Sequence, residues 1–577
     1  MITKKTSSIG AQILLIKMIS SICRKIALSL SILGISHLSE AQQTIGLFTQ
    51  EPGSLDGYVL FAPLASDTTY LIDKCGYKVH TWTSAYTPGQ SVYLLEDGNL
   101  LHSGSANNSV FVNGGNGGIL ELLDWSSNVL WNYAISTTTQ CQHHDILRLP
   151  NGNILAIVWE FKPHPQAIAA GRDTALLGGP LWPDKIVEVQ PIGTDSAAIV
   201  WEWHAWDHLI QEYDATKNNY GVVADHTELI NLNFVPGAPR AADWLHSNAL
   251  AYNEELDQVM LSVHNFSEIW IIDHSTTTAE AASHAGGLHG QGGDLLYRWG
   301  NPQAYNRGNA LNKRLYSQHN AHWIPAGLPD EGNVIVFNNG LNRPGGNYSS
   351  VDIFQLPVDS AGNYTLLPNQ AYGPNAAYWS YTAPVQTDFY SSNISGAQRL
   401  SNGNTLICEG DQGNFFEVDA NDSIVWRYVN PVSQQGILSQ GTTTNSNPVF
   451  RCTLYEPSYA GLAGHTLTPA GPIELNPLPY NCNMLTGVGE KNLQSSLSVV
   501  NPFNSSLVLT SYSGISDADL TLCDVSGRCI LQFGEVNLGA NIPTSFQLNS
   551  DLPSGIYFLK VQSSKQNLVV KLVHARD

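Results

Sequence analysis

Charged residues make up only 13% of this 577-residue chain, and methionine occurs only 4 times. The charged share is about half of the usual value, which argues against a coiled coil or a charged helical bundle. Positive charge is scarcest, with 27 Lys+Arg against 48 Asp+Glu and a formal net charge of -21. A field of that sign repels phosphate backbones, so the sequence disfavours a nucleic-acid partner.

Several motifs of metal and cofactor sites are missing. None of the 8 cysteines forms a CxxC pair, no HExxH is present, and the Gly-rich stretch 286–293 matches neither a P-loop nor a dinucleotide fingerprint. Beyond residue 41, no run approaches the 18 or so apolar residues that a membrane span needs. The sequence therefore predicts no metal, no cofactor and no membrane span in the mature chain, and it leaves disulfide pairing open.

The first 41 residues have the pattern of a secretory signal peptide. Basic residues precede the apolar stretch 26–35, and the small residues Ser39 and Ala41 stand just before Gln42. This order of basic, apolar and small residues is typical of a cleaved signal, with a membrane anchor as the alternative.

What the chain has in plenty is glycine (50), tyrosine (24) and tryptophan (14), and a repeat runs through residues 58–430. Each copy combines an apolar segment that ends in tryptophan with a Leu-x-Asn/Asp-Gly-Asn turn, seen at Asp97-Gly98, Asn151-Gly152 and Asn402-Gly403. Such turns favour β-hairpins. About six copies of four strands indicate an all-β fold, a six-bladed β-propeller over 42–480 whose two ends complete one blade together. An open solenoid or two sandwiches is the alternative.

Alignment of the copies places histidines at related positions. His144 and His319 fall five residues before the aligned leucine position, and His246 is within one residue of that register. Because inner strands of a propeller converge on its channel, we expect these three rings to meet. Asp145 and Asp243 could orient them. Histidines that only cap hydrogen bonds within the blades are the alternative.

Arg343 follows the hairpin that begins at His319 and could form an anion site with the histidines, since its planar fork suits sulfate. A surface arginine is the alternative. We assign catalysis to His144, His246, His319 and Arg343, and substrate binding to His143, His264 and His322. Zinc on these histidines is disfavoured because no fixed carboxylate motif accompanies them. Chelation by His204 and His208 is disfavoured because the sequence shows no third ligand.

The C-terminal stretch resembles the sorting domain of Bacteroidetes type IX secretion. The matching features are Asn501-Pro502-Phe503, the turn from Asp524 to Arg528, the box from Leu552 to Phe558 and a basic last strand at Lys571. The resemblance implies a β-sandwich over 496–577 after a linker at 481–495. It also implies the type IX machinery as a partner, export through the periplasm and outer membrane, and a secreted or cell-surface protein. An ordinary binding sandwich is the alternative.

Residues 55–480 resemble the bacterial aryl-sulfate sulfotransferase family. The resemblance rests on Asp243 to Asn248, Gln318 to Pro325, Asn338-Asn339-Gly340 with Arg343, and Ser395 to Leu400. It implies transfer of a sulfuryl group from an aryl sulfate donor to a phenolic acceptor through a sulfated histidine, without a nucleotide sulfate donor. One departure stands out: the family's sulfated histidine aligns near Glu409 to Asn414, where this chain has no histidine.

The sequence therefore predicts a secreted sulfotransferase that works through a channel histidine, with His319 or His246 as nucleophile. The alternative is a non-catalytic propeller that binds a glycan or an aromatic ligand. A quinone-dependent dehydrogenase propeller is disfavoured, because those proteins need more blades and an acidic metal-binding set.

Overall fold

The computed structural model describes residues 43–235, 240–443 and 446–478, Cys482, and most of 497–574. It divides into two compact units, Met1–Tyr480 and Asn481–Asp577. The predicted signal peptide lies outside the described residues, as does nearly all of the predicted linker. Within the described ranges, no helix is long and apolar enough to cross a membrane.

The described part of the first unit contains six antiparallel sheets of four or five strands. The first three along the chain are built from β2 (Tyr58–Pro63), β3 (Thr68–Asp73), β4 (Lys78–Thr83) and β29 (Val449–Tyr455); from β5 (Pro88–Leu94), β6 (Leu100–Ser105), β7 (Gly118–Leu123) and β8 (Val129–Ala134); and from β9 (Gln140–Arg148), β10 (Ile154–Glu160), β11 (Asp184–Ile192) and β12 (Ser196–His204).

The other three sheets follow in chain order. They consist of β15 (Ser247–Asn253), β16 (Gln258–Val263), β17 (Glu268–Asp273) and β18 (Leu295–Trp299); of β19 (His319–Trp323), β20 (Val334–Asn338), β21 (Ser350–Phe354) and β22 (Trp379–Tyr381); and of β23 (Gly396–Arg399), β24 (Thr405–Glu409), β25 (Asn414–Val418), β26 (Ile424–Val429) and β1 (Gly46–Gln50).

Short elements decorate these sheets. They are β13 (Leu209–Ile210) with β14 (Ile230–Asn231), β27 (Val432–Ser433) with β28 (Gly436–Ile437), and the helices α2 (His164–Ala169) and α3 (Thr278–Ala281).

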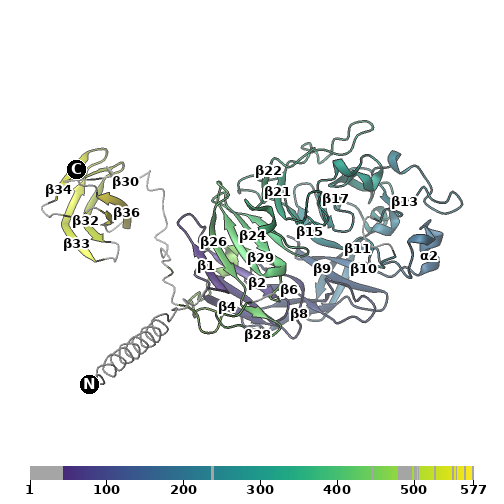
Figure 1. Ribbon diagram of the computed structural model, residues 1–577, viewed down its shortest axis with the longest axis horizontal. Coiled ribbons are helices and arrows are strands. Elements are labelled where there is room, and N and C mark those ends of the chain that lie inside the picture. The colour runs from purple at the N-terminus through teal and green to yellow at the C-terminus, as the bar shows by residue number, and fades with distance from the viewer. Residues whose placement is uncertain are drawn as a thin grey trace, which may run out of the picture. The chain divides into compact units, whose positions relative to one another are not determined.

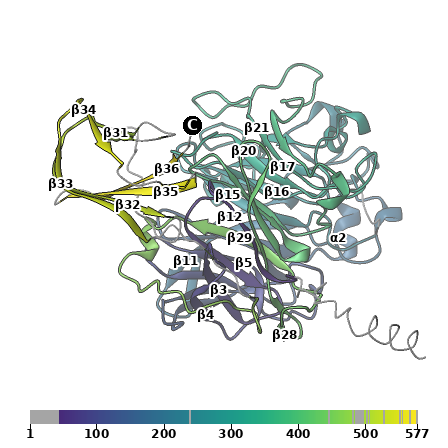
Figure 2. The same cartoon turned by 60° about the vertical axis from the view of Figure 1, so that its left-hand side comes forward.

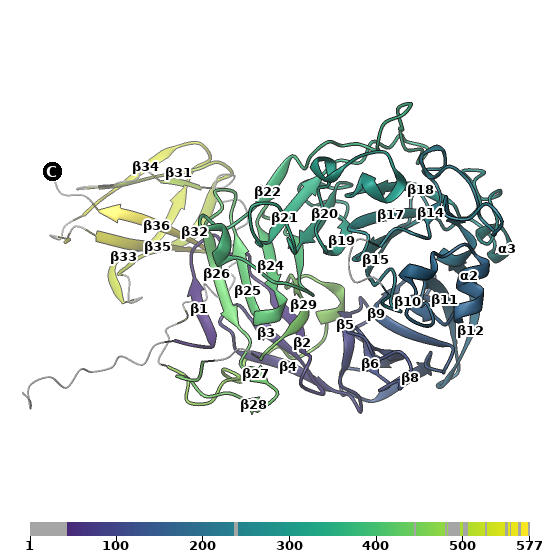
Figure 3. The same ribbon diagram turned by 45° about the vertical axis from the view of Figure 1, so that its right-hand side comes forward.

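The sheets form a closed ring. One edge strand of each, in the order β5, β9, β15, β19, β23 and β29, packs against the next, and β29 returns to β5 (Figure 3). This is the arrangement of a β-propeller, and the number of sheets equals the number of blades that the sequence predicts. The all-β prediction is confirmed.

Both ends of the unit help to close the ring. The late strand β29 pairs with β2, and the early strand β1 pairs with β26, so purple and green strands lie together in Figure 1. A buried ion pair joins the same two sheets, with Lys74 Nζ 2.6 Å from Glu417 Oε2. The early and late repeats therefore complete each other, as the sequence predicts.

The Asn/Asp-Gly turns adopt the conformation expected of them. Gly98, Gly152 and Gly403 have φ values of 83°, 88° and 88°, and each lies in the turn between the first two strands of its sheet. Residues with a side chain are strained in that region, which is why glycine recurs at this point of the repeat.

The described part of the second unit contains two sheets over one core. A three-stranded sheet contains β30 (Leu497–Val499), β31 (Ser506–Ser511) and β34 (Pro543–Gln547), and a four-stranded sheet contains β32 (Ile515–Asp524), β33 (Cys529–Leu538), β35 (Gly555–Gln562) and β36 (Asn567–His574) (Figure 2). The alternating burial of β31 is typical of a strand with one face on a core.

The cysteines are mostly reduced. Cys75 and Cys482 are disulfide-bonded, whereas the remaining described cysteines are free thiols: Cys141, Cys408, Cys452, Cys523 and Cys529.

Candidate functional site

The structure brings five of the predicted histidines into one chain of ring contacts. The ring centroids of His144 and His246 are 4.5 Å apart, those of His246 and His264 are 5.1 Å apart, and those of His264 and His319 are 5.3 Å apart. His143 contacts His144 at 5.1 Å. These five residues, called the histidine cluster below, come from three sheets and span 177 positions (319 minus 143 plus 1) of the sequence.

Bulged inner strands carry most of the cluster. The strand register shifts in β9 around His144, in β15 beside His246 and in β19 after His319. Positive φ values occur at His144 (53°), His246 (54°) and Asn320 (53°). Bulges re-aim side chains and are common next to active sites. In β9 and just before β15 the left-handed residue is the histidine itself, whereas in β19 it is Asn320. His319 therefore lies one residue away from the position that the alignment of the repeats gave it.

His246 is paired with a carboxylate. Its Nδ1 bonds to Asp243 Oδ2, while Asp243 Oδ1 accepts a 3.0 Å bond from Trp159 Nε1. Burial lowers the pKa of His246, but the charge and hydrogen bond of Asp243 outweigh it and hold that pKa above 6.5. The sequence suggestion that Asp243 orients a histidine thus matches the geometry, and the protonated form of His246 is stabilised relative to that of a free imidazole.

His319 is held as one neutral tautomer. The amide nitrogen of Asn339 donates to the carbonyl oxygens of Ser391 and Ile394, so its Oδ1 faces His319 Nδ1 at 2.8 Å and must accept a hydrogen from it. The lone pair of the ring is then on Nε2. Burial first, and the neighbouring His264 second, keep the pKa of His319 well below 6.5, so the ring stays neutral at neutral pH.

His264 repeats this arrangement with Asn265. The Asn265 amide donates to the carbonyl oxygens of Asp243 and Trp244, and its Oδ1 lies 2.8 Å from His264 Nδ1. Burial, followed by the charge of His246, lowers the pKa of His264 to about 4. His264 is therefore a second neutral ring with its lone pair on Nε2, and it stands between His246 and His319.

His143 and His144 form the other end of the cluster. His143 stacks on Trp159 with centroids 3.9 Å apart, and its Nε2 lies 3.3 Å from Asp184 Oδ1. Its Nδ1 is 2.8 Å from His144 Nδ1, so one of these two nitrogens donates to the other. Burial, then the charge of His246, keeps the pKa of His144 well below 6.5. His246, whose pKa is raised, thus lies beside His144 and His264, whose pKa values are lowered.

His322 lies in a separate group, with Arg451. Arg451 Nη1 bonds to Asp145 Oδ2 at 2.8 Å and to the Tyr93 hydroxyl at 2.9 Å. Burial, then the charge of Arg451, helps to lower the pKa of His322 to about 4. Asp145 therefore binds an arginine from the closing strand β29 instead of orienting a histidine.

Arg343 makes its contacts beside the cluster. Its guanidinium lies 4.2 Å from the ring centroid of Tyr348 and 5.5 Å from that of Tyr316, and Nη2 donates to Ser350 Oγ. Lys313 lies over the same Tyr316 ring at 4.8 Å and acts on the charge of His264. Two cations thus share Tyr316 at the His264 side of the cluster, and the contacts place Arg343 on tyrosines instead of on a histidine.

The segment from Glu409 to Asn414 runs from the last residue of β24 to the first residue of β25 and lies near Ser391 and Ser395. The Gly410 amide donates to Ser395 Oγ, and burial, aided by the charge of Asp411, raises the pKa of Glu409 to about 7. This segment occupies the same place in its sheet, after the second strand, as His264 and Asn339 do in theirs. Carboxyl and amide groups stand there in place of a histidine.

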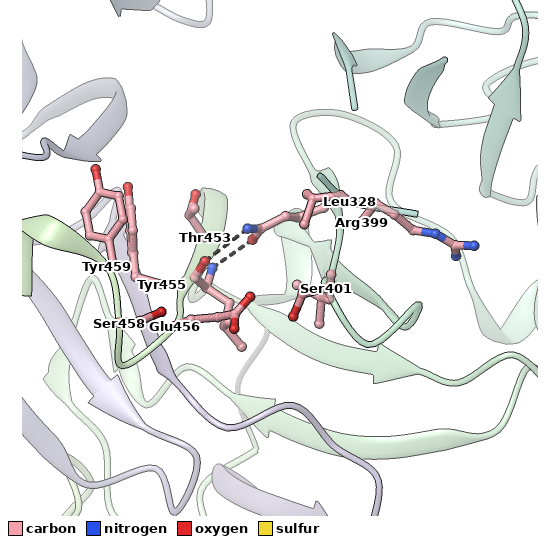
Figure 4. A pocket seen from close by; sticks show the side chains of 11 residues that line it. Leu328, Arg399, Ser401, Thr453, Tyr455, Glu456, Ser458 and Tyr459 are labelled. Atoms are coloured by element: carbon pink, nitrogen blue, oxygen red, sulfur yellow. Dashed lines mark hydrogen bonds between the residues drawn. The ribbon is translucent and has the colours of Figure 1, made fainter. Parts of the chain in front are cut away.

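A pocket of about 350 Å³ is lined by residues outside the histidine cluster. Its lining includes Gln398, Tyr455 and Tyr459, and the Gln398 side chain bonds to both backbone groups of Leu454 (Figure 4). None of the predicted site residues lines it.

Sequence reasoning missed the residues that set the state of each ring. Asn339, Asn265, Asp184, Lys313 and Arg451 were not singled out for a site role. Only Asn339 carried a signal, because it stands in the Asn-Asn-Gly turn after β20. Asn265 directly follows His264 in the chain. Asp184, Lys313 and Arg451 act from positions far apart in the sequence, and no spacing along the chain reveals such contacts.

Two segments of the chain match known families. Residues 66–451, more than half of the chain, match the family described as arylsulfotransferase (ASST). Residues 501–575 match the secretion system C-terminal sorting domain. The chain belongs to the arylsulfotransferase family and carries a sorting domain that indicates export to the cell surface or the medium.

Solved structures with a related fold are distant. A protein of unknown function from Bacteroides caccae is 12% identical, with a TM-score of 0.38 over 69% of this chain and 98% of that one. A putative 6-phosphogluconolactonase from Bacteroides fragilis is 11% identical, with a TM-score of 0.32 over 70% and 99%. A search of curated proteins found no match.

Proposed function

We propose that the protein moves a sulfuryl group from an aryl sulfate to a phenol through a covalent histidine intermediate, without a nucleotide donor. The observation that carries this proposal is the charge pattern of the histidine cluster. Burial lowers the pKa of His246 but Asp243 outweighs it and raises that pKa above 6.5, whereas burial lowers the pKa values of His144, His264 and His319. Covalent transfer needs both an unprotonated nucleophile and a proton donor for the leaving group.

His319 is the proposed nucleophile. Asn339 fixes its proton on Nδ1, which leaves the Nε2 lone pair available to attack sulfur. The sequence also offers His246 as nucleophile, but its Nδ1 is bonded to Asp243, and the raised pKa of His246 shifts the ring toward its protonated form. A protonated ring has no lone pair to offer, which assigns His246 to the acid–base role.

In the proposed first step, the His319 Nε2 lone pair forms a bond to sulfur while the bond from sulfur to the aryl oxygen breaks. The departing oxygen takes the bonding electrons and the proton from His246. In the second step, the acceptor phenol gives its proton to His246, and its oxygen displaces His319 from sulfur. Each step conserves charge, and the two steps together return both histidines to their starting states.

The sulfate oxygens need cationic or hydrogen-bonding partners as the bond order at sulfur changes. Arg343 and Lys313 are proposed to attract the anionic donor, because both lie on Tyr316 beside His264. His143, His144, His264 and His322 are proposed to contact donor or acceptor. The aryl sulfate and the phenol are thus the proposed small-molecule partners.

A quenched-flow experiment tests the proposal. The protein is mixed with 4-nitrophenyl sulfate and phenol, nitrophenol release is followed, and peptides are searched by mass spectrometry for sulfated histidine. We expect sulfate on His319, and a loss of at least about 10³-fold in turnover for His319→Ala. His164→Ala, at an exposed histidine of α2, is the matched control. Full turnover by His319→Ala would exclude this nucleophile.

A second function is favoured by one observation, the absence of histidine between Glu409 and Asn414. A propeller that has lost the reaction would still bind an aromatic or glycan ligand at the same face. Ligand binding by the wild type, combined with no nitrophenol release under any acceptor concentration, would support that alternative.

A further inference from the structure

A second cluster of potential ligand groups lies outside the histidine cluster. The cluster consists of one ring nitrogen of His208, one ring nitrogen of His284 and one carboxylate oxygen of Asp294. These three atoms all lie within 4.8 Å of one another. His208 precedes β13, His284 follows α3 and Asp294 immediately precedes β18. Residues from two loops, 205–208 and 282–294, therefore converge on one point.

Both ring nitrogens of His208 face hydrogen-bond acceptors, which a neutral ring cannot satisfy without a further positive charge. Its Nε2 is 2.8 Å from the carbonyl oxygen of Ala281, which can only accept, so Nε2 carries the hydrogen. In a neutral ring, Nδ1 then presents a lone pair, and it faces Asp294 Oδ1 at 2.7 Å. Two lone pairs at that distance repel each other unless a proton or a cation lies between them.

The same carboxylate oxygen faces a second ring. His284 Nδ1 also lies 2.7 Å from Asp294 Oδ1, and 61% of the His284 side chain is exposed, whereas His208 is fully buried. His208 thus donates a hydrogen bond from Nε2 to a backbone carbonyl, while its Nδ1 faces a carboxylate and a second histidine. Histidines that bind a metal through one ring nitrogen commonly donate from the other nitrogen to a carbonyl in this way.

We propose that His208, His284 and Asp294 bind a divalent transition metal, with Zn²⁺ the best fit to two imidazoles and one carboxylate. Three protein ligands leave one position, which the exposed side of His284 opens to water. The ion ties the loop after β12 to the loop between β17 and β18. His204, which the sequence paired with His208, contacts Glu160 instead and takes no part.

The test uses the full mature chain, stripped with a chelator and titrated with ZnCl₂ by calorimetry. We expect one Zn²⁺ to bind at this site in each chain. We also expect the melting temperature to rise by about 3 °C at a free Zn²⁺ concentration of roughly 100 times the dissociation constant. His284→Ala removes an exposed ligand and is expected to weaken this binding at least tenfold.

His226→Ala is the matched control, because His226 is also half exposed and also bonds to a carboxylate, Glu228, but lies outside the cluster. It is expected to keep full Zn²⁺ affinity. Asp294→Asn is a second disruptive variant, expected to lose affinity as His284→Ala does. Absence of Zn²⁺ binding, or binding that His284→Ala leaves unchanged, would overturn the proposal and leave a plain imidazolium–carboxylate pair. Sulfuryl transfer at 25 °C is expected to survive chelation, which separates this site from the proposed reaction.

Discussion

Single residues decide which histidine is charged and which is neutral in this site. The three neutral rings differ little in type or depth of burial from the charged one, yet only His246 has a carboxylate bonded to its Nδ1. Burial and a neighbouring ring lower the pKa values of His319 and His264, and the amide oxygens of Asn339 and Asn265 fix the proton of each ring on Nδ1. The tautomer and charge of each ring therefore depend on the group that is bonded to its Nδ1.

Replacement of Asn339 tests the role of the fixed tautomer. Asn339→Ala removes the acceptor for His319 Nδ1, so the ring can turn or carry its proton on Nε2, and we expect kcat to fall about 10- to 100-fold. Asn265→Ala makes the equivalent change at His264 and is the matched control. A larger fall in Asn265→Ala than in Asn339→Ala, measured by nitrophenol release, would point to His264 as nucleophile.

The pH profile of turnover reports the His246–Asp243 pair. The acid form of His246 is present below its pKa, which Asp243 holds above 6.5, so kcat is expected to fall as pH rises through that raised value. Asp243→Asn removes the charge that raises this pKa, and the alkaline limb is expected to move to lower pH. An alkaline limb that stays in place in Asp243→Asn would show that another group supplies the proton.

At the scale of elements, charged side chains join neighbouring sheets. His274, which follows β17, bonds to Asp257 at 2.7 Å and to Glu188 of β11 at 3.0 Å. Burial lowers its pKa, but the hydrogen bonds and charges of the two carboxylates outweigh burial and raise that pKa to about 9. The fourth sheet along the chain, β15 to β18, is thus tied to the third sheet by one histidine and two carboxylates.

This link predicts a pH dependence of stability. A raised pKa stabilises the folded state fully below the unfolded value near 6.5 and loses that effect as pH rises through about 9. His274→Ala is therefore expected to lower the free energy of unfolding by on the order of 2 kcal/mol at pH 6 and by much less at pH 10. Urea unfolding at both pH values measures this; an equal loss at both would mean that packing, and not charge, accounts for the effect.

The sheets themselves were readable from the repeat, because Asn/Asp-Gly turns and apolar strands are local properties. The bulges in β9, β15 and β19 were not readable in advance. They depend on which residues of two strands face each other, and this displaced His319 by one residue from the position that the alignment gave it.

At the scale of the whole molecule, the chain is an exported arylsulfotransferase-family protein with a sorting domain at residues 501–575. We expect the surface or secreted form to begin near Gln42 and to lack the tail after about residue 490, since such tails are often removed on export. Mass spectrometry of protein from the medium and from cell fractions measures both ends. A chain ending at residue 495 is expected to stay inside the outer membrane; its appearance in the medium would contradict a sorting role for the tail.

The sequence by itself determined the all-β class, the closing of early on late repeats and the family. It also predicted a meeting of His144, His246 and His319, because turn residues, strand patterns and repeated positions are local properties of the sequence. Tertiary structure alone decided the charge of each ring, the capture of Asp145 by Arg451, the position of Arg343 on two tyrosines and the meeting of His208 with Asp294. These outcomes depend on burial and on partners up to 306 positions apart (451 minus 145), and pKa values and tautomers respond to such partners within a few ångströms, whatever their separation along the chain.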